Sequence, residues 1–148
     1  MYYWKIPPRI KVLEALGSIA DERVKFISNN EARVTSSTGE RVYTVKWDGG
    51  RAIVSDDNGS VYRGYLGYPS IAFLMLKGVL PYNEKLARAL KGIPWKRLNE
   101  KYKSYAVVER IIKSRLKKRG IDEREVDDFI GEVLEKISEL KFIKLEVE

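Results

Sequence analysis

Residues 23–66 read RVKFISNNEARVTSSTGERVYTVKWDGGRAIVSDDNGSVYRGYL, and this stretch decides the fold class. It contains short runs rich in Val, Ile, Thr and aromatic residues, in which apolar and polar side chains alternate as in half-buried strands. The breaks SNN, TG, DGG and DNG consist of residues that favour tight turns. The stretch therefore predicts an antiparallel meander of four or five strands, in which SVYRGYL (60–66) would be the fifth.

The segment before the meander has a different periodicity. Pro7 and Pro8 suit the first turn of a helix, and apolar residues follow them at helical spacing. Within the third predicted strand, Tyr43, Val45 and Trp47 share the larger apolar face. We expect that face to pack on the N-terminal helix.

Beyond Pro69 the pattern is helical to the end. The stretch SIAFLMLKGVL (70–80) is apolar on nearly all sides, which is typical of a buried helix. The last two helices are joined by the short link Gly120–Ile121, which predicts an antiparallel helix hairpin. The predicted fold is therefore α+β: an N-terminal helix, an antiparallel four- to five-stranded meander, and a helical C-terminal half ending in the hairpin. We expect residues 1–68 and residues 69–148 to share one core.

The composition limits which catalytic and metal-binding groups the chain can supply. The 148 residues include 0 His and 0 Cys, so imidazole bases, thiolate nucleophiles and the common zinc sites are excluded. We expect a non-enzymatic protein with no cofactor and no metal. A site at Asp48, Asp56 and Asp57 is the alternative, but carboxylates in turns are more often turn formers.

Composition also indicates where the protein works. Abundant Lys, Arg and Glu with few thermolabile side chains are typical of heat-adapted proteins. The chain has no apolar stretch long enough to span a bilayer and no secretory leader pattern. We therefore expect a cytoplasmic protein with no membrane partner.

Charge is segregated along the chain. Residues 69–119 contain 14 Lys and Arg against 3 Asp and Glu, whereas residues 120–148 contain 4 against 10. Such segregation indicates that the basic block meets a polyanion or that the two blocks neutralise each other. In the second case Arg115 and Arg119 would pair with an acidic stripe on the last helix, which comprises Asp128, Glu132, Glu135 and Glu139.

Other cations are expected to stay free. On the penultimate helix, Arg110, Lys113 and Lys117 lie opposite the apolar face. Basic side chains interleaved with aromatic ones can hold phosphates and stack bases, so our leading hypothesis is non-specific binding of RNA or DNA. The predicted contact residues are Trp95, Lys96, Arg97, Lys101, Lys103, Arg110, Lys113, Lys117 and Lys118, with Arg63 and Tyr65 on the fifth strand. The alternative is a protein–protein or homo-oligomerisation module, in which the last helix meets a second chain.

Overall fold

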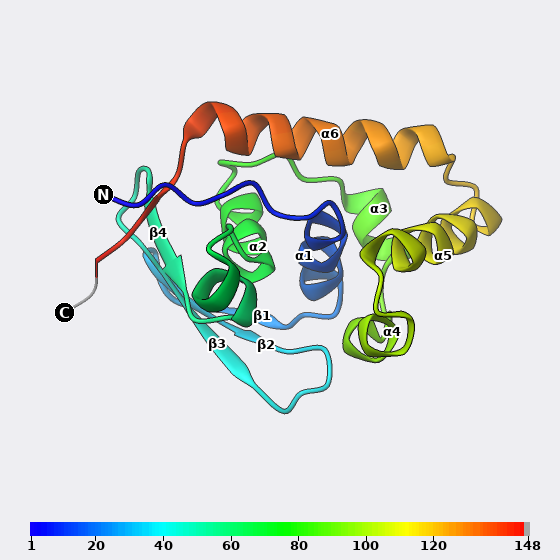
Figure 1. The fold of residues 1–148 in the computed structure, drawn as a ribbon, viewed down its shortest axis with the longest axis horizontal. Coiled ribbons are helices and arrows are strands. Elements are labelled where there is room, and N and C mark those ends of the chain that lie inside the picture. The colour runs from blue at the N-terminus through cyan, green and yellow to red at the C-terminus, as the bar shows by residue number, and fades with distance from the viewer. Residues whose placement is uncertain (147–148) are drawn as a thin grey trace.

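The computed structural model describes residues 1–146, and its architecture is the predicted α+β fold (Figure 1). The first half contains α1 (Ile10–Ala20), β1 (Val24–Ser28), β2 (Glu31–Thr35), β3 (Val42–Trp47), β4 (Ala52–Ser55) and the π-helix η1 (Gly59–Arg63). The second half contains α2 (Tyr68–Leu76), α3 (Glu84–Ala89), α4 (Trp95–Tyr102), α5 (Tyr105–Lys118), α6 (Glu123–Leu140) and β5 (Ile143–Lys144).

Five strands form one sheet in the order β1-β2-β3-β4-β5. The first four are the predicted antiparallel meander, with Val34 opposite Tyr43 and Val45 opposite Ser55. The last strand comes from the C-terminal segment and pairs with β4 in parallel, which the sequence pattern did not predict. Two residues are too short a run to show strand periodicity.

The prediction of a fifth strand at residues 60–66 was wrong, because this segment begins as η1. The buried Asp57 carboxylate accepts hydrogen bonds from the Ser55 and Ser60 hydroxyls and from the Ser60 backbone N–H. These bonds close the chain into a turn directly after β4, so the ladder ends there. Gly64 then takes a φ of 74°, a left-handed conformation that favours glycine, and ends η1.

The helix on the inner sheet face is α2, so the prediction that this face packs on the N-terminal helix was wrong. Tyr43 meets Tyr68 edge-on with ring centroids 6.3 Å apart, and Trp47 meets Phe73 at 5.7 Å. Helix α1 packs beside α2 on the side away from the sheet, and it also contacts α3, α5 and α6 (Figure 1). Burial between the sheet and α1 explains why α2 is apolar on nearly all sides.

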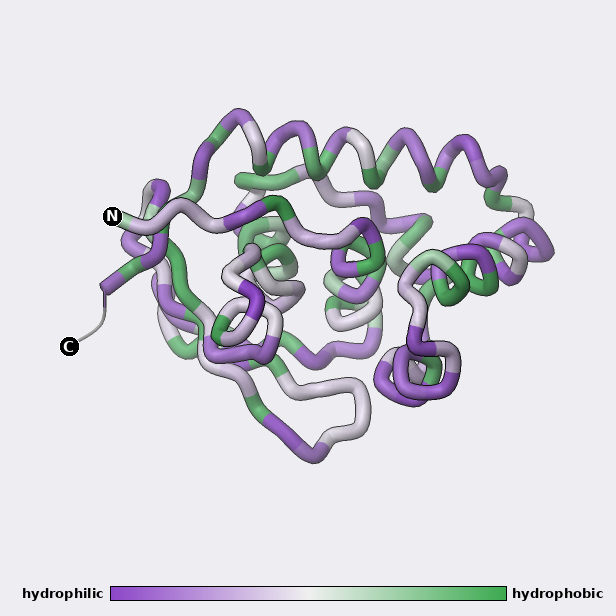
Figure 2. Tube along the Cα trace, viewed as in Figure 1, coloured by the Kyte–Doolittle hydropathy of each residue, from purple (hydrophilic) through white to green (hydrophobic). Residues whose placement is uncertain are grey.

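Helices α5 and α6 form the predicted hairpin. Val108, Ile112 and Leu116 of α5 are buried. Figure 2 shows the hydrophobic turns of α6 on the side facing the other helices and its hydrophilic turns outside. The buried residues of α6 are Val126, Phe129, Ile130, Val133 and Ile137. The apolar arc of α6 is therefore covered by this chain's own residues.

Candidate functional site

A cavity of about 560 Å³ opens between α1, the β2–β3 loop, η1 and α4. We call it the inner cavity. Its wall is closed where the β2–β3 loop meets α4: the Lys96 backbone N–H donates to Ser37 Oγ at 3.2 Å, and Lys96 Nζ lies 3.8 Å from Glu40 Oε2. The segments that form this cavity are thus widely separated in sequence.

Two charged residues of α1 line the cavity and are nearly buried. Lys11 Nζ lies 3.0 Å from Glu14 Oε2, with side chains 13% and 7% exposed. Burial alone would lower the pKa of Lys11, but the charge of Glu14 and the neighbouring Tyr65 and Tyr105 outweigh it and raise that pKa. The ammonium group is therefore charged at neutral pH.

Buried polar atoms without a hydrogen-bond partner are concentrated at this cavity. Within residues 1–146 there are four such side-chain atoms: Glu14 Oε2, Arg23 Nε, Trp95 Nε1 and Asn99 Oδ1. All four residues line the inner cavity. Two of the four atoms are nevertheless ion-paired, since Glu14 Oε2 lies 3.0 Å from Lys11 Nζ and Arg23 Nε lies 3.7 Å from Asp21 Oδ2. Trp95 Nε1 faces the backbone of Gly17. Asn99 Oδ1 is therefore the atom among these four that is left for a ligand to satisfy, because buried polar groups in folded proteins nearly always have partners.

Tyrosine hydroxyls supply further donors beside the cavity. Burial raises the pKa of Tyr68 to about 12, and burial likewise raises the pKa of Tyr65 to about 12 and that of Tyr43. These phenols therefore keep their protons at neutral pH and can donate hydrogen bonds to an anion.

The lining is cationic overall, with six basic and three acidic residues. Arg41, Arg63 and Lys103 are exposed, and none of the three forms an ion pair within the described part of the chain. Arg41 Nη1 instead lies 3.4 Å from Asn58 Oδ1. The acidic Asp57 is bonded to serines, as described above, so its carboxylate is not turned toward these cations.

The structure brings together some of the predicted contact residues. Arg63, Trp95, Lys96 and Lys103 line the inner cavity, and Tyr65 lies against Gly59 at its edge. Trp95, however, is 1% exposed, so the prediction that it offers a surface for base stacking was wrong. Its indole packs on α1, where the Gly17 backbone leaves room for the ring.

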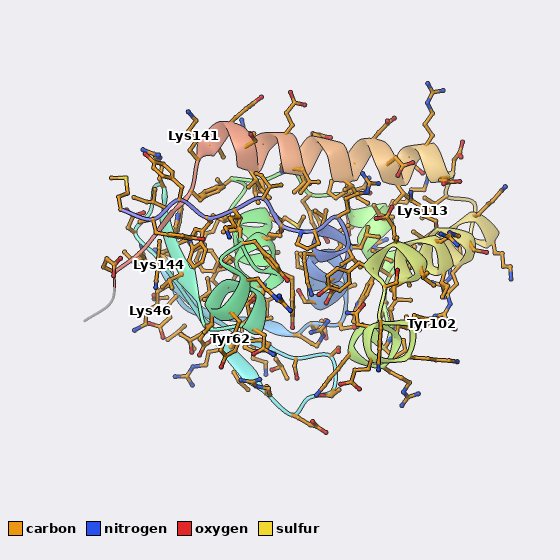
Figure 3. All side chains as sticks on the ribbon, in the orientation of Figure 1. Lys46, Tyr62, Tyr102, Lys113, Lys141 and Lys144 are labelled. Carbon is orange, nitrogen blue, oxygen red and sulfur yellow. The ribbon has the colours of Figure 1, made fainter. Side chains whose placement is uncertain are left out.

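The remaining predicted cations lie outside the cavity. Lys113 was predicted to point into solvent, and this was wrong: its ammonium lies 2.9 Å from Glu109 and 2.5 Å from Asp127 between α5 and α6 (Figure 3). The side chain is consequently only 13% exposed. The other predicted residues outside the cavity are exposed: Arg97, Lys101, Arg110, Lys117 and Lys118.

The predicted ion pairs between the acidic stripe and α5 do not form within residues 1–146. Arg119 donates to the Ala89 carbonyl at 3.0 Å. Within residues 1–146 neither Arg115 nor Arg119 forms an ion pair with the stripe. The basic and acidic blocks meet instead through Lys113 and through Lys85, which pairs with Glu125 at 3.2 Å.

The three aspartates considered for a metal have separate structural roles. Asp48 accepts hydrogen bonds from the backbone N–H groups of Gly50 and Ala52, and Asp56 accepts one from Thr44. No group of three or more potential metal ligands occurs among the residues that the structure describes.

Several residues of the cavity were missed by the sequence analysis, above all Lys11, Glu14 and Arg23. A signal was present on α1, where Lys11, Glu14 and Ser18 recur at the i, i+3 and i+7 positions of an otherwise apolar helix. That spacing places three polar side chains on one face, which is unusual for a helix that is buried on nearly all sides.

Residues 4–143 match the profile of a family described as Uncharacterised conserved protein UCP014422. The chain belongs to this family. No curated protein and no solved structure matches the chain. Among the described residues, no helix has the length and apolar character needed to cross a membrane.

Proposed function

We propose that this protein binds a phosphorylated ligand of nucleotide size in the inner cavity. The observation that carries the proposal is the group of exposed cations that line the cavity, Arg41, Arg63 and Lys103, none of which forms an ion pair within residues 1–146. The buried Asn99 Oδ1, which has no hydrogen-bond partner in the same part of the chain, adds to it. A volume of about 560 Å³ suits such a ligand, since small-molecule sites typically measure about 300–1,000 Å³.

The residue types around the cavity favour phosphate over other anions. Arg41 and Arg63 carry planar guanidinium groups that match two phosphate oxygens at once, and Lys103 adds a point charge. Tyr43 and Tyr105 lie near the same opening, and one face of each ring is covered by a cation: Arg41 lies 5.6 Å from the Tyr43 centroid, and Lys11 Nζ lies 5.0 Å from the Tyr105 centroid. The opposite faces remain for a ligand ring. A phosphate joined to a ring would engage both kinds of group.

We propose binding rather than catalysis because the sequence contains 0 His and 0 Cys. Tyr65 and Tyr68, with their raised pKa values, are poor bases at neutral pH. The nearly buried charges of Lys11 and Glu14 are paired with each other.

The alternative of self-association through the last helix has less support. Its apolar arc is already buried within this chain, so a second chain would meet mainly the acidic stripe. Charged surfaces without an apolar centre make poor stable interfaces.

Isothermal titration calorimetry with adenosine 5′-monophosphate, ribose 5-phosphate and adenosine tests the proposal. We expect both phosphorylated compounds to bind and adenosine to bind at least tenfold more weakly. Arg41→Gln should weaken the binding of adenosine 5′-monophosphate by about tenfold, the equivalent of one charge-assisted contact of about 1.4 kcal/mol.

Arg97→Gln is the matched control, because Arg97 is an exposed arginine of α4 outside the cavity. We expect this variant to bind as the parent does. Equal affinity for adenosine and its monophosphate, or no binding of any of the three compounds in low salt, would refute the proposal.

A further inference from the structure

A second hollow adjoins the inner cavity on the other side of η1. It is an open groove of about 830 Å³, which we call the outer groove. Its walls include the N-terminal segment, the outer side of β3 and β4, η1 and the C-terminal segment, with Tyr2, Lys5, Lys46, Tyr62, Arg63 and Lys144 among its lining residues. In Figure 3, Lys46 and Lys144 lie at the end of the molecule that carries both termini, and Tyr62 lies on η1.

The two hollows share one lining side chain. Arg63, the last residue of η1, lines both the inner cavity and the outer groove. A ligand longer than a mononucleotide that contacts the Arg63 guanidinium could therefore reach residues of both hollows.

The outer groove combines free cations with exposed aromatic surface. Lys5, Lys46 and Lys144 form no ion pair within residues 1–146. Two acidic residues also line the groove: Asp56, which accepts a hydrogen bond from the Thr44 N–H, and Glu146. Tyr62 is 78% exposed and Tyr2 is 38% exposed, although hydrophobic side chains of this size are usually covered. Cations that follow a backbone and aromatic rings that stack bases are the two elements of single-strand recognition.

We infer that the ligand of the inner cavity is one nucleotide of a single-stranded nucleic acid, whose neighbouring nucleotides run past Arg63 into the outer groove. This inference rests on the proposed function, since it requires the inner cavity to hold a phosphate. It places the nucleic acid on η1 and the sheet rather than on the exposed face of α5.

Fluorescence anisotropy with labelled decamers of deoxyadenylate and adenylate, beside calorimetry with adenosine 5′-monophosphate, tests the inference. The single-stranded decamers should bind at least tenfold more tightly than the mononucleotide and more tightly than a decamer duplex. Tyr62→Ala and Lys46→Gln should each weaken decamer binding by about fivefold or more and leave mononucleotide binding unchanged. Lys46→Gln should also reduce the dependence of affinity on salt by about one phosphate contact.

Lys136→Gln provides the matched control, because it removes one exposed charge from α6, remote from both hollows. It should leave decamer affinity unchanged. If the mononucleotide binds and the decamer binds no more tightly, the inference is wrong and the proposed function stands. Equal binding of the duplex, or decamer binding that responds to Lys117→Gln but not to the groove variants, would also overturn it. Failure of the mononucleotide to bind refutes both.

Discussion

Lys113 Nζ lies 2.5 Å from Asp127 Oδ1, so one ammonium group joins α5 to α6. Arg9, just before α1, reaches the same carboxylate at 2.6 Å and also pairs with Glu109 at 3.1 Å. Three helices therefore meet in one ion-pair network. Networks that include half-buried groups stabilise a fold more than isolated surface pairs do.

We expect Lys113→Met to lower the free energy of unfolding by about 1–2 kcal/mol, between the values typical of exposed and of buried ion pairs. The loss arises because Glu109 and Asp127 would keep only Arg9 as a cationic partner. Lys117→Met is the control, since Lys117 is exposed on the same helix and forms no ion pair in the described region. Chemical denaturation of both variants measures the difference, and equal stabilities would show that the network contributes nothing.

The same network should make stability depend on acid pH. Burial alone would raise the pKa of Glu109, but hydrogen bonds from Arg9 and Lys113 outweigh it and hold that pKa below its ordinary 4.5. The hydrogen bond from Lys113 likewise holds the pKa of Asp127 below its ordinary 3.8. Carboxylates with lowered pKa values stabilise the fold above their unfolded pKa, and this stabilisation is lost as the pH falls through the folded values.

Denaturation of the parent protein and of Lys113→Met across the pH range measures this dependence. The difference in unfolding free energy should be constant from about pH 5 to pH 9 and should shrink below about pH 4. A difference that persists unchanged to pH 2 would mean that Lys113 stabilises the fold through packing and not through charge.

Local pattern was sufficient for most of the fold. Alternation predicted β1 to β4. The helix starts also have local signals, because Asn83, Ser104 and Asp122 are residue types that favour N-caps and accept hydrogen bonds from the first turns of α3, α5 and α6. Each of these signals depends on a few neighbouring residues, so a single sequence is enough to detect it.

The inner cavity could not be predicted from local patterns. Its charges come from α1, the β2–β3 loop, η1 and α4, and no local pattern says that these segments converge. The role of Lys113 was missed for the same reason. Its position on α5 is opposite the apolar face, but α6 and Arg9 bring carboxylates and a guanidinium to that side. Tertiary contacts of this kind are visible only in the folded chain.

Two helical glycines should respond to alanine in opposite directions. A Cβ on Gly17 would stand 2.6 Å from Trp95 Nε1, and the indole is too confined to move away. We expect Gly17→Ala to destabilise the fold by about 1–3 kcal/mol through overpacking. A Cβ on Gly131 of α6 would meet nothing within 4 Å, so Gly131→Ala should stabilise the fold by about 0.5–1 kcal/mol through helix propensity.

Thermal or chemical denaturation measures the change in stability of each variant, and near-ultraviolet circular dichroism reports on the environment of Trp95. A stabilising Gly17→Ala would show that the indole has room to shift. In that case the packing of α4 on α1 would not restrict the shape of the inner cavity.

The ion pair between Lys11 and Glu14 should be strongly coupled, because both side chains are nearly excluded from solvent. Lys11→Met would leave the Glu14 carboxylate buried without its cation, and we expect a loss of about 3–5 kcal/mol. The double variant Lys11→Met/Glu14→Gln removes both charges and should recover at least about 1–2 kcal/mol of that loss. A double-mutant cycle measured by urea denaturation gives the coupling energy directly.

The exposed pair of Glu84 and Arg88, with side chains 64% and 78% exposed, is the matched control and should couple by only about 0.3–0.5 kcal/mol. Additive losses at Lys11 and Glu14 would show that water reaches this pair and screens it, and the lining of the inner cavity would then be far more solvated than its burial implies.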